Sequence, residues 1–354
     1  MQRSNWKSVA VLAMVAAAYY GAYARAQAQS DAKAASVIAA MRKELGGDQK
    51  IAAMKGLSLR ADYRRELSAG GPGGGGMMMI MRGGGPGGGP PDGGGQLVGK
   101  MEIDIALPDK YLRSDVGTSG LGMTRTDGFE GTRAFQEVIP NSPGMTIRID
   151  NPANDPALAK TLLTRTRRDL ARLMLGLTGA TQPDFPVTFS YAGQAESPDG
   201  KADMIDVAGP EDFKCRLFVD ADAHLPLMIS YQDVEPRVIT RAIGGPGRGA
   251  PPPGGEGTRG QAPPAGGRGV GNARLEGLPP EERAAIEKEM RDADAAPPKM
   301  VEYRIFFSEH RKVDGVSLPH RIARGTGAKT TEEWDITSYK VNPAFKADRF
   351  KVGQ

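Results

Sequence analysis

The chain has 354 residues, including 48 glycines, 27 prolines and a single cysteine. One cysteine excludes a disulfide-stapled scaffold and a multi-cysteine zinc site, and the lack of a strict three-residue glycine period excludes collagen. Lys and Arg together number 46 against 42 Asp and Glu, so the sequence lacks the sustained basic field of a general nucleic-acid-binding protein.

Residues 1–28 have the pattern of a secretory signal peptide. Arg3 and Lys7 supply its positive start, residues 9–20 its apolar stretch, and residues 24–28 two overlapping Ala-x-Ala cleavage sites. We therefore expect export to the periplasm. The alternative is an inner-membrane anchor formed by an uncleaved N-terminal segment, although the apolar run is shorter than the roughly 20 residues that span a bilayer.

The rest of the chain, residues 29–354, is expected to form a single domain with two interruptions. Residues 68–96 and 243–278 are rich in glycine and proline, a composition typical of disordered insertions. The first insertion contains an apolar island, Met77 to Met81. Contact of this island with an apolar groove or a membrane is the alternative to plain disorder.

The first elements after the leader have helix and then strand patterns. A helical stripe over residues 31–45 ends at two glycines, and a second short helix is expected over 48–55. Alternating apolar and polar residues then predict strands, because successive side chains of a strand point to opposite faces. These strands cover residues 57–63, 97–105, 111–114 and a hairpin over 121–137 that we expect to turn at Asp127 and Gly128.

Residues 155–179 give the clearest helix pattern in the chain. Asp155 is the expected N-cap, Pro156 suits the first turn, and Gly179 is the expected stop. Leucine and methionine side chains form an apolar stripe along it. The polar side holds four arginines, Arg165, Arg167, Arg168 and Arg172. We expect a solvated basic face over a buried stripe; the alternative is a face that meets anionic lipid headgroups or a partner protein.

The residues after 186 return to strand patterns that are joined by short polar turns. Short connections between alternating strands predict an antiparallel meander. Together with the earlier strands, this pattern predicts an α+β fold with one dominant antiparallel sheet of about ten or eleven strands and few helices.

The sequence shows no catalytic or metal-binding constellation. The three histidines lack the spacings of helix-borne zinc ligands, and the glycine-rich stretches lack phosphate-loop and nucleophile-elbow spacings. Cys215 alternates with Phe213 and Leu217, so we expect a buried structural thiol and not a nucleophile. We therefore expect no enzyme activity, catalytic residue, metal or cofactor. A hydrolase that uses scattered carboxylates is the alternative.

Several short motifs follow one another along the chain. They are Leu45-Gly46-Gly47, Ile51-Ala52-Ala53-Met54-Lys55-Gly56-Leu57, Leu107-Pro108-Asp109-Lys110-Tyr111, Leu217-Phe218-Val219-Asp220 with His224-Leu225-Pro226-Leu227, Val313-Asp314-Gly315-Val316-Ser317-Leu318-Pro319-His320, and Asn342-Pro343 followed by Phe345 and Phe350. Their order resembles that of the periplasmic outer-membrane lipoprotein carrier and sorting family, the LolA/LolB-like proteins. The motifs span most of the chain outside the two glycine-rich insertions.

This resemblance implies an unclosed antiparallel half β-barrel whose concave apolar face is covered by helices and holds acyl chains. The implied function is a periplasmic binding or carrier protein for a lipid or lipid-modified protein. The alternative is a non-catalytic envelope interaction or sensing module with a solid core. Expected partners are lipid or acylated protein and envelope membrane proteins, and not nucleic acid. The apolar faces of the predicted strands supply the cavity candidates: Met101, Ile103, Phe189, Leu217, Ile229, Tyr303, Ile305, Trp334 and Ile336.

Overall fold

The structure is a computed structural model of the whole chain. It describes residues 31–66, 77–82, 96–118, 123–140, 146–148, 155–198, 200–235, 238–243, 281, 284, 288, 299–327 and 329–351. For residues 77–82, 140, 146–148 and 238–243, only the backbone is described. The expected signal peptide, residues 1–28, lies outside the described residues.

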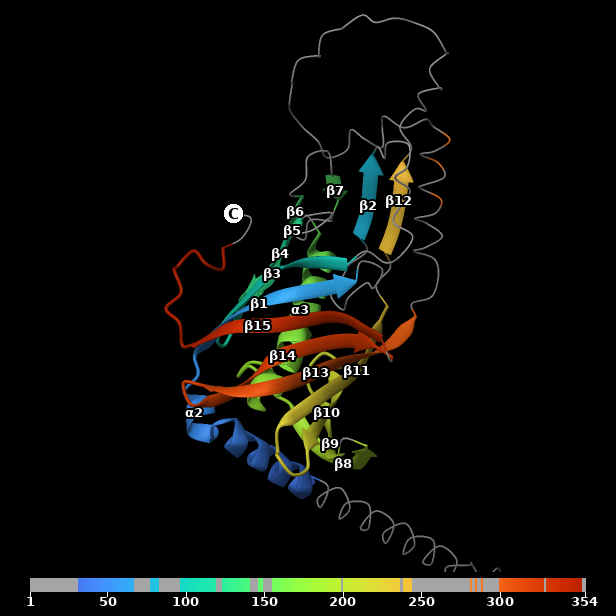
Figure 1. Ribbon diagram of the computed structural model, residues 1–354. Coiled ribbons are helices and arrows are strands. Elements are labelled where there is room, and N and C mark those ends of the chain that lie inside the picture. The colour runs from blue at the N-terminus through green and yellow to red at the C-terminus, as the bar shows by residue number, and fades with distance from the viewer. Residues whose placement is uncertain are drawn as a thin grey trace, which may run out of the picture.

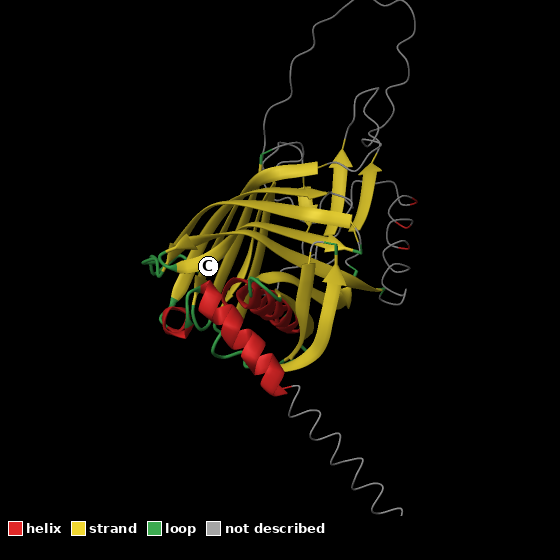
Figure 2. Cartoon of the chain, turned by 60° about the horizontal axis from the view of Figure 1, so that its bottom comes forward, coloured by secondary structure: helices red, strands yellow, loops and turns green. Residues whose placement is uncertain are grey.

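Twelve strands form one antiparallel sheet in the order β6-β5-β4-β3-β1-β15-β14-β13-β11-β10-β9-β8 (Figure 1). The two end strands do not pair with each other, so the sheet remains an unclosed half-barrel, as the arch in Figure 2 shows. The predicted α+β half-barrel is confirmed, with twelve strands in place of ten or eleven. The strands are β1 (Gly56–Glu66), β3 (Gln96–Ala106), β4 (Lys110–Gly117), β5 (Met123–Glu130), β6 (Arg133–Pro140), β8 (Thr188–Ser197), β9 (Gly200–Ala208), β10 (Lys214–Asp220), β11 (Pro226–Val234), β13 (Met300–Val313), β14 (Val316–Thr326) and β15 (Lys329–Val341).

A second sheet has three strands, β2 (Met77–Arg82), β7 (Thr146–Arg148) and β12 (Val238–Ile243). Strand β2 pairs in parallel with β12 and antiparallel with β7. It lies within the insertion expected over 68–96. The sequence analysis predicted none of these three strands. In β2 the reason is that its run of methionines and isoleucine does not alternate with polar residues.

The hairpin between β5 and β6 turns later than we expected. Glu130 pairs with Arg133, so the turn lies at Gly131 and Thr132, where Gly131 has a φ of 60°. Gly128 lies inside β5 instead, at a position where a Cβ would overlap the carbonyl oxygen of Tyr111. The predicted turn at Asp127 and Gly128 is therefore wrong: this glycine permits close packing within the sheet.

Helix α3 (Pro156–Thr178) lies across the concave face of the sheet (Figure 2). It contacts β5 and β6 toward one edge and β10 and β11 toward the other. Asp155 accepts hydrogen bonds from the backbone amides of Ala157 and Leu158, and Gly179 ends the helix with a φ of 65°, so both predicted caps are confirmed.

A helix over residues 31–45 covers the lower end of the half-barrel (Figure 1). Arg42 Nε donates to the carbonyl oxygen of Gly179 at 2.9 Å, which joins this helix to the end of α3. Gly46 lies against the turn between β13 and β14. The short helix α2 (Asp48–Ala52) follows and ends before Lys55, where we had expected it to end.

One large hydrophobic cluster fills the space between the sheet and these helices. The last turns of α3, from Leu170 to Thr178, are buried throughout. Gly176 lies so close to Phe307 of β13 that a Cβ would overlap the aromatic ring. The second half of α3 is therefore packed directly on the sheet, and a glycine is needed at this contact.

Candidate functional site

A band of charged side chains crosses the concave face near the end of the barrel where β1 ends and β15 begins. We call it the charged belt; its members are Arg125, Asp127, Arg113, Asp115, Arg65, Glu332, Arg324 and Asp233. Strand register places them in a slanted row, because Arg113 pairs with Asp127 and Glu332 lies between Arg65 and Arg324. The rest of the concave face is mostly apolar, and we call it the apolar zone; Ile103, Leu318 and Ile336 belong to it. Asp203 of β9 is an exception, because it is buried in phase with Ile205 and accepts hydrogen bonds from Tyr191 and Gln194.

Glu332 is the centre of the charged belt. Its Oε1 accepts hydrogen bonds from Arg65 at 3.0 Å, Arg113 at 2.5 Å and Trp334 Nε1 at 2.6 Å. The side chain is 3% exposed. Burial disfavours the charged carboxylate, but the guanidinium groups of Arg113 and Arg65 overcome this effect and hold the pKa of Glu332 well below its usual value.

Asp115 forms the second acidic point of the charged belt. Its two carboxylate oxygens accept from Nε and Nη2 of Arg113, each at 2.9 Å, in a bidentate pair. Arg65 adds a third contact at 2.9 Å. Burial again disfavours the charge, yet Arg113 and Arg65 lower the pKa of Asp115. Both acids are thus held ionised inside the barrel.

Arg324 differs from the other buried arginines of the charged belt. It is 5% exposed, and no described carboxylate lies within ion-pair distance of it. Its guanidinium carbon lies 4.7 Å from the centre of the Trp334 ring, and its Nε has no described hydrogen-bond partner. Arg65, Arg113 and Arg324 therefore face only two buried acids, Asp115 and Glu332, which leaves an excess positive charge.

Helix α3 brings Asp169 and Arg172 to the end of the charged belt near β11. Arg172 is buried, with Nη1 at 2.9 Å from Asp169 and 4.0 Å from Asp233. Its guanidinium carbon lies 3.7 Å from the centre of the Tyr231 ring. The prediction of a solvated arginine face is therefore wrong at Arg172, because α3 has the sheet on this side as well.

Tyrosine hydroxyls add uncharged polar groups beside the charged belt. Tyr231 and Tyr303 are stacked, with ring centres 5.5 Å apart. Their hydroxyls and that of Tyr63 are buried without a described hydrogen-bond partner. Burial is the main reason why the pKa of Tyr63 and of Tyr303 rises to about 12. All three phenols are therefore neutral and can donate a hydrogen bond.

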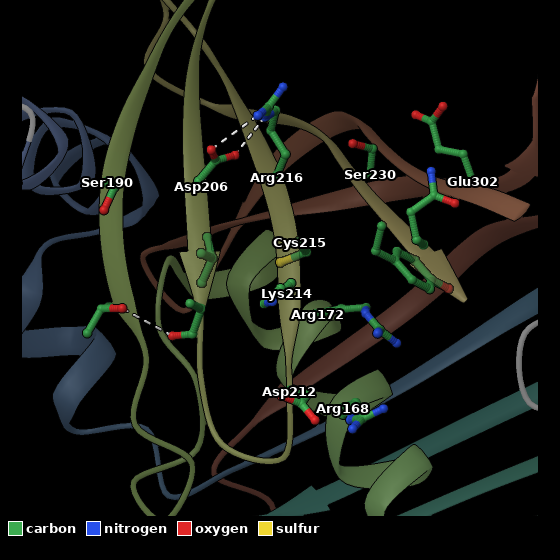
Figure 3. A pocket seen from close by; sticks show the side chains of 15 residues that line it. Arg168, Arg172, Ser190, Asp206, Asp212, Lys214, Cys215, Arg216, Ser230 and Glu302 are labelled. Carbon is green, nitrogen blue, oxygen red and sulfur yellow. Dashed lines mark hydrogen bonds and ion pairs between the residues drawn. The ribbon is translucent and has the colours of Figure 1, made fainter. Parts of the chain in front are cut away.

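A hollow of about 700 Å³ lies where β10 and β11 separate (Figure 3). The pairing of these strands stops at Arg216 and Ser230, after which β10 pairs only with β9 and β11 only with β13. The hollow is lined by Arg168, Arg172, Thr188, Ser190, Asp206, Val207, Ala208, Asp212, Lys214, Cys215, Arg216, Ser230, Tyr231, Gln232 and Glu302. Its lining therefore includes side chains from both faces of the sheet and two arginines of α3, Arg168 and Arg172.

The nine predicted cavity residues lie in or against the main hydrophobic cluster. Eight of them are buried, and Phe189 is partly buried against the same cluster. None of the nine lines the hollow. Their role in ligand binding stays a prediction.

The sequence analysis missed the charged belt, although the sequence holds a signal for it. Arg113 and Asp115 follow Tyr111 at two-residue spacing, so they lie in phase with a buried position. Glu332 precedes Trp334 by two residues in the same way. A charged side chain in phase with buried apolar neighbours predicts a buried ion pair, since an isolated buried charge is too costly.

Cys215 is buried, as predicted. Burial raises the pKa of its thiol to about 12, so it is a weak nucleophile. Among the described residues, no three His, Cys, Asp or Glu side chains are grouped as metal ligands would be. No described helix combines the length and the apolar character needed to cross a membrane.

Comparisons with known proteins give similar structures at low identity. A LolA superfamily protein from Nitrosomonas europaea is 9% identical, with a TM-score of 0.40 over 90% of this chain and 96% of that chain. A DUF1329 family protein from Desulfovibrio piger is 8% identical, with the same TM-score and coverage. A domain named for outer membrane lipoprotein sorting, from Vibrio parahaemolyticus, has a TM-score of 0.37 and 8% identity over 85% of this chain and 93% of that chain.

No protein-family model matches the chain, and no curated protein matches it. The three similarities are too distant to define a family for this chain.

Proposed function

We propose that this chain is a non-catalytic binding or carrier protein for a lipid or a lipid-modified protein. The observation that supports this best is the two-zone concave face. An acyl chain requires an apolar wall, and the polar end of an amphiphile requires hydrogen-bonding groups beside it. The apolar zone and the charged belt supply both on one surface, and α3 lies across them.

In this proposal the acyl chain contacts the cavity candidates Met101, Ile103, Phe189, Leu217, Ile229, Tyr303, Ile305, Trp334 and Ile336. The second half of α3 already packs on this wall, so the ligand must displace the helix. Burial of an acyl chain contributes about 0.8 kcal/mol per methylene, or roughly 11 kcal/mol for about fourteen methylenes. This energy offsets the exposure of the leucines of α3.

The proposed compartment is the periplasm, reached by way of residues 1–28, or the periplasmic face of the inner membrane if this segment is retained. Envelope membrane proteins are the proposed partners in ligand delivery. No step in this proposal needs a cofactor or a catalytic group.

Photoaffinity labelling with a diazirine fatty acid tests the proposal on the full chain. Bound lipid is first extracted with organic solvent, and the refolded protein is then irradiated with the probe. We expect labelled peptides from α3 and from the inward faces of β13 to β15, and competition by unlabelled palmitate. Labelling that is spread over the outer surface, or that palmitate does not reduce, would contradict lipid binding.

The second candidate function is an envelope interaction or sensing module with a solid core. The observation that favours it is the tight burial of eight cavity candidates in one cluster. Native mass spectrometry of the protein from its own periplasm separates the two functions. Co-purified lipid supports the carrier, whereas a ligand-free mass with no uptake of added fatty acid supports the module.

A further inference from the structure

Two arginines of α3, Arg168 and Arg172, line the hollow between β10 and β11. Lys214 and Cys215 pair with β9 but not with β11, and Tyr231 and Gln232 pair with β13 but not with β10. Figure 3 shows Arg168 and Arg172 of α3 in the interval between these strands. The two arginines are four residues apart on one helix, so they lie on the same face.

The guanidinium groups in the hollow have unused donors. Arg172 is 3% exposed, and its Nε has no described partner although Nη1 pairs with Asp169. Nε of Arg168 is also buried without a described partner, while Nη2 donates to the carbonyl oxygen of Glu211. A buried guanidinium donor without an acceptor costs free energy. These two Nε atoms are not accessible from the hollow, but the positive charge of their guanidinium groups is not fully compensated, and an anion in the hollow would lower that cost.

The acidic residues of the hollow are largely engaged elsewhere. Asp206 accepts two hydrogen bonds from Arg216, at 2.7 and 3.1 Å. Glu302 accepts from Arg304 at 3.1 and 3.3 Å. Asp212 is the remaining acid among the residues that line the hollow, whereas two lining cations remain, Arg168 and Lys214. No described ion pair involves Lys214. The free charge in the hollow is therefore positive.

We infer that the hollow is a binding site for an anionic oxygen group, a phosphate or a carboxylate. The guanidinium group of Arg168 and the ammonium group of Lys214, which both line the hollow, supply the charged donors. Ser230 and Gln232, on the rim formed by β11, supply neutral donors. None of the nine cavity candidates lines the hollow, so the inference stands whether or not the concave face binds an acyl chain.

Isothermal titration of the full chain tests this inference with sodium phosphate, glycerol 3-phosphate and sodium acetate as probes. The variant is Arg168→Gln with Lys214→Gln, which removes two charges without a change in the buried Arg172. The control is Lys201→Gln with Arg311→Gln, which removes two charges that pair with Glu196 and Glu309 away from the hollow. Thermal melts establish that both variants are folded.

We expect at least one probe to bind, and its Kd to rise about tenfold or more in the variant but not in the control, because each lost charge-assisted hydrogen bond is strong. Bound phosphate should also protect Lys214 from acetylation, as read by mass spectrometry. Failure of all three probes to bind, or equal loss in both double variants, would overturn the inference.

A lipid headgroup is one possible source of the phosphate group. Flotation with vesicles that contain phosphatidylglycerol identifies it: association that the Arg168→Gln, Lys214→Gln variant loses assigns the group to lipid. Binding of glycerol 3-phosphate without vesicle association assigns it to a soluble phosphate ester. Fatty acid labelling of α3 reports on the acyl site, so failure of the anion site and failure of lipid binding are distinguished.

Discussion

The apolar zone and the charged belt occupy the same concave face but are stabilised in different ways. Ile103, Leu318 and Ile336 of the apolar zone are buried against other hydrocarbon, where the cost of a substitution depends on the volume removed. Glu332 of the charged belt is buried against three cations, where the cost depends on the charge left without a partner. The comparison shows that equal burial does not imply equal tolerance to substitution.

The largest expected effect is at Glu332. Glu332→Gln leaves Arg65, Arg113 and Arg324 with one buried acid, so we expect a loss of about 3–5 kcal/mol in the free energy of unfolding. Urea denaturation at neutral pH measures it. The matched control is Glu333→Gln, since Glu333 is the next residue and pairs with Arg64 and Arg321 on the outer face. The control should lose less than about 1 kcal/mol. Similar losses in both variants would contradict the central role of Glu332.

A cavity in the apolar zone should have the next largest effect. Leu318→Ala removes a fully buried side chain, so we expect a loss of about 2–4 kcal/mol by the same measurement. Leu227→Ala is the control, because Leu227 is exposed on β11 and should change stability by less than about 0.5 kcal/mol. A loss at Leu318 as small as that of the control would show that the apolar zone is loosely packed.

Acid should weaken the charged belt before it affects the apolar zone. Folding lowers the pKa of Asp115 and Glu332 below their ordinary values of 3.8 and 4.5. The unfolded chain therefore binds more protons near pH 4, so these carboxylates contribute full stability above about pH 5 and lose it as pH falls below their ordinary values. Urea midpoints between pH 3 and pH 7 should show this decline.

His310 adds a separate acid-dependent contribution. Burial, with help from His320, lowers the pKa of His310 to about 4, so stability also declines from about pH 6.5 to 4. The background His310→Gln removes that part of the curve. In this background, Glu332→Gln should flatten the remaining decline, whereas Leu318→Ala should shift the whole curve without a change in its shape. An unchanged acid limb in Glu332→Gln would contradict an ionised buried Glu332.

The smallest effect is expected at Arg324. Arg324→Met leaves two buried cations with two buried acids, so the free energy of unfolding should stay within about 1 kcal/mol of the parent or rise slightly. Chemical denaturation of Arg324→Met beside Arg113→Met provides the test, because Arg113 is hydrogen-bonded to both acids. Arg113→Met should be clearly destabilising. A loss of similar size at Arg324 would show that this cation has a strong partner.

Much of the fold follows from the order of local patterns. The alternation in β1, β3, β9 to β11 and β13 to β15 predicts half-buried strands, and the caps at Asp155 and Gly179 fix the ends of α3. The candidate site is harder to predict. Arg172 belongs to the polar side of α3, and only the position of α3 inside the half-barrel shows that this side is covered too.

The sequence by itself determined the α+β class, the antiparallel strands and the capped helix, because these depend on side-chain periods and turn residues within a few positions. The tertiary structure decided the rest. The pairing of β1 with β15 brings Arg65 to Glu332, and the separation of β10 from β11 opens the hollow. These contacts join segments far apart in the chain, and their energies depend on which charges become buried together, a quantity that no local pattern contains.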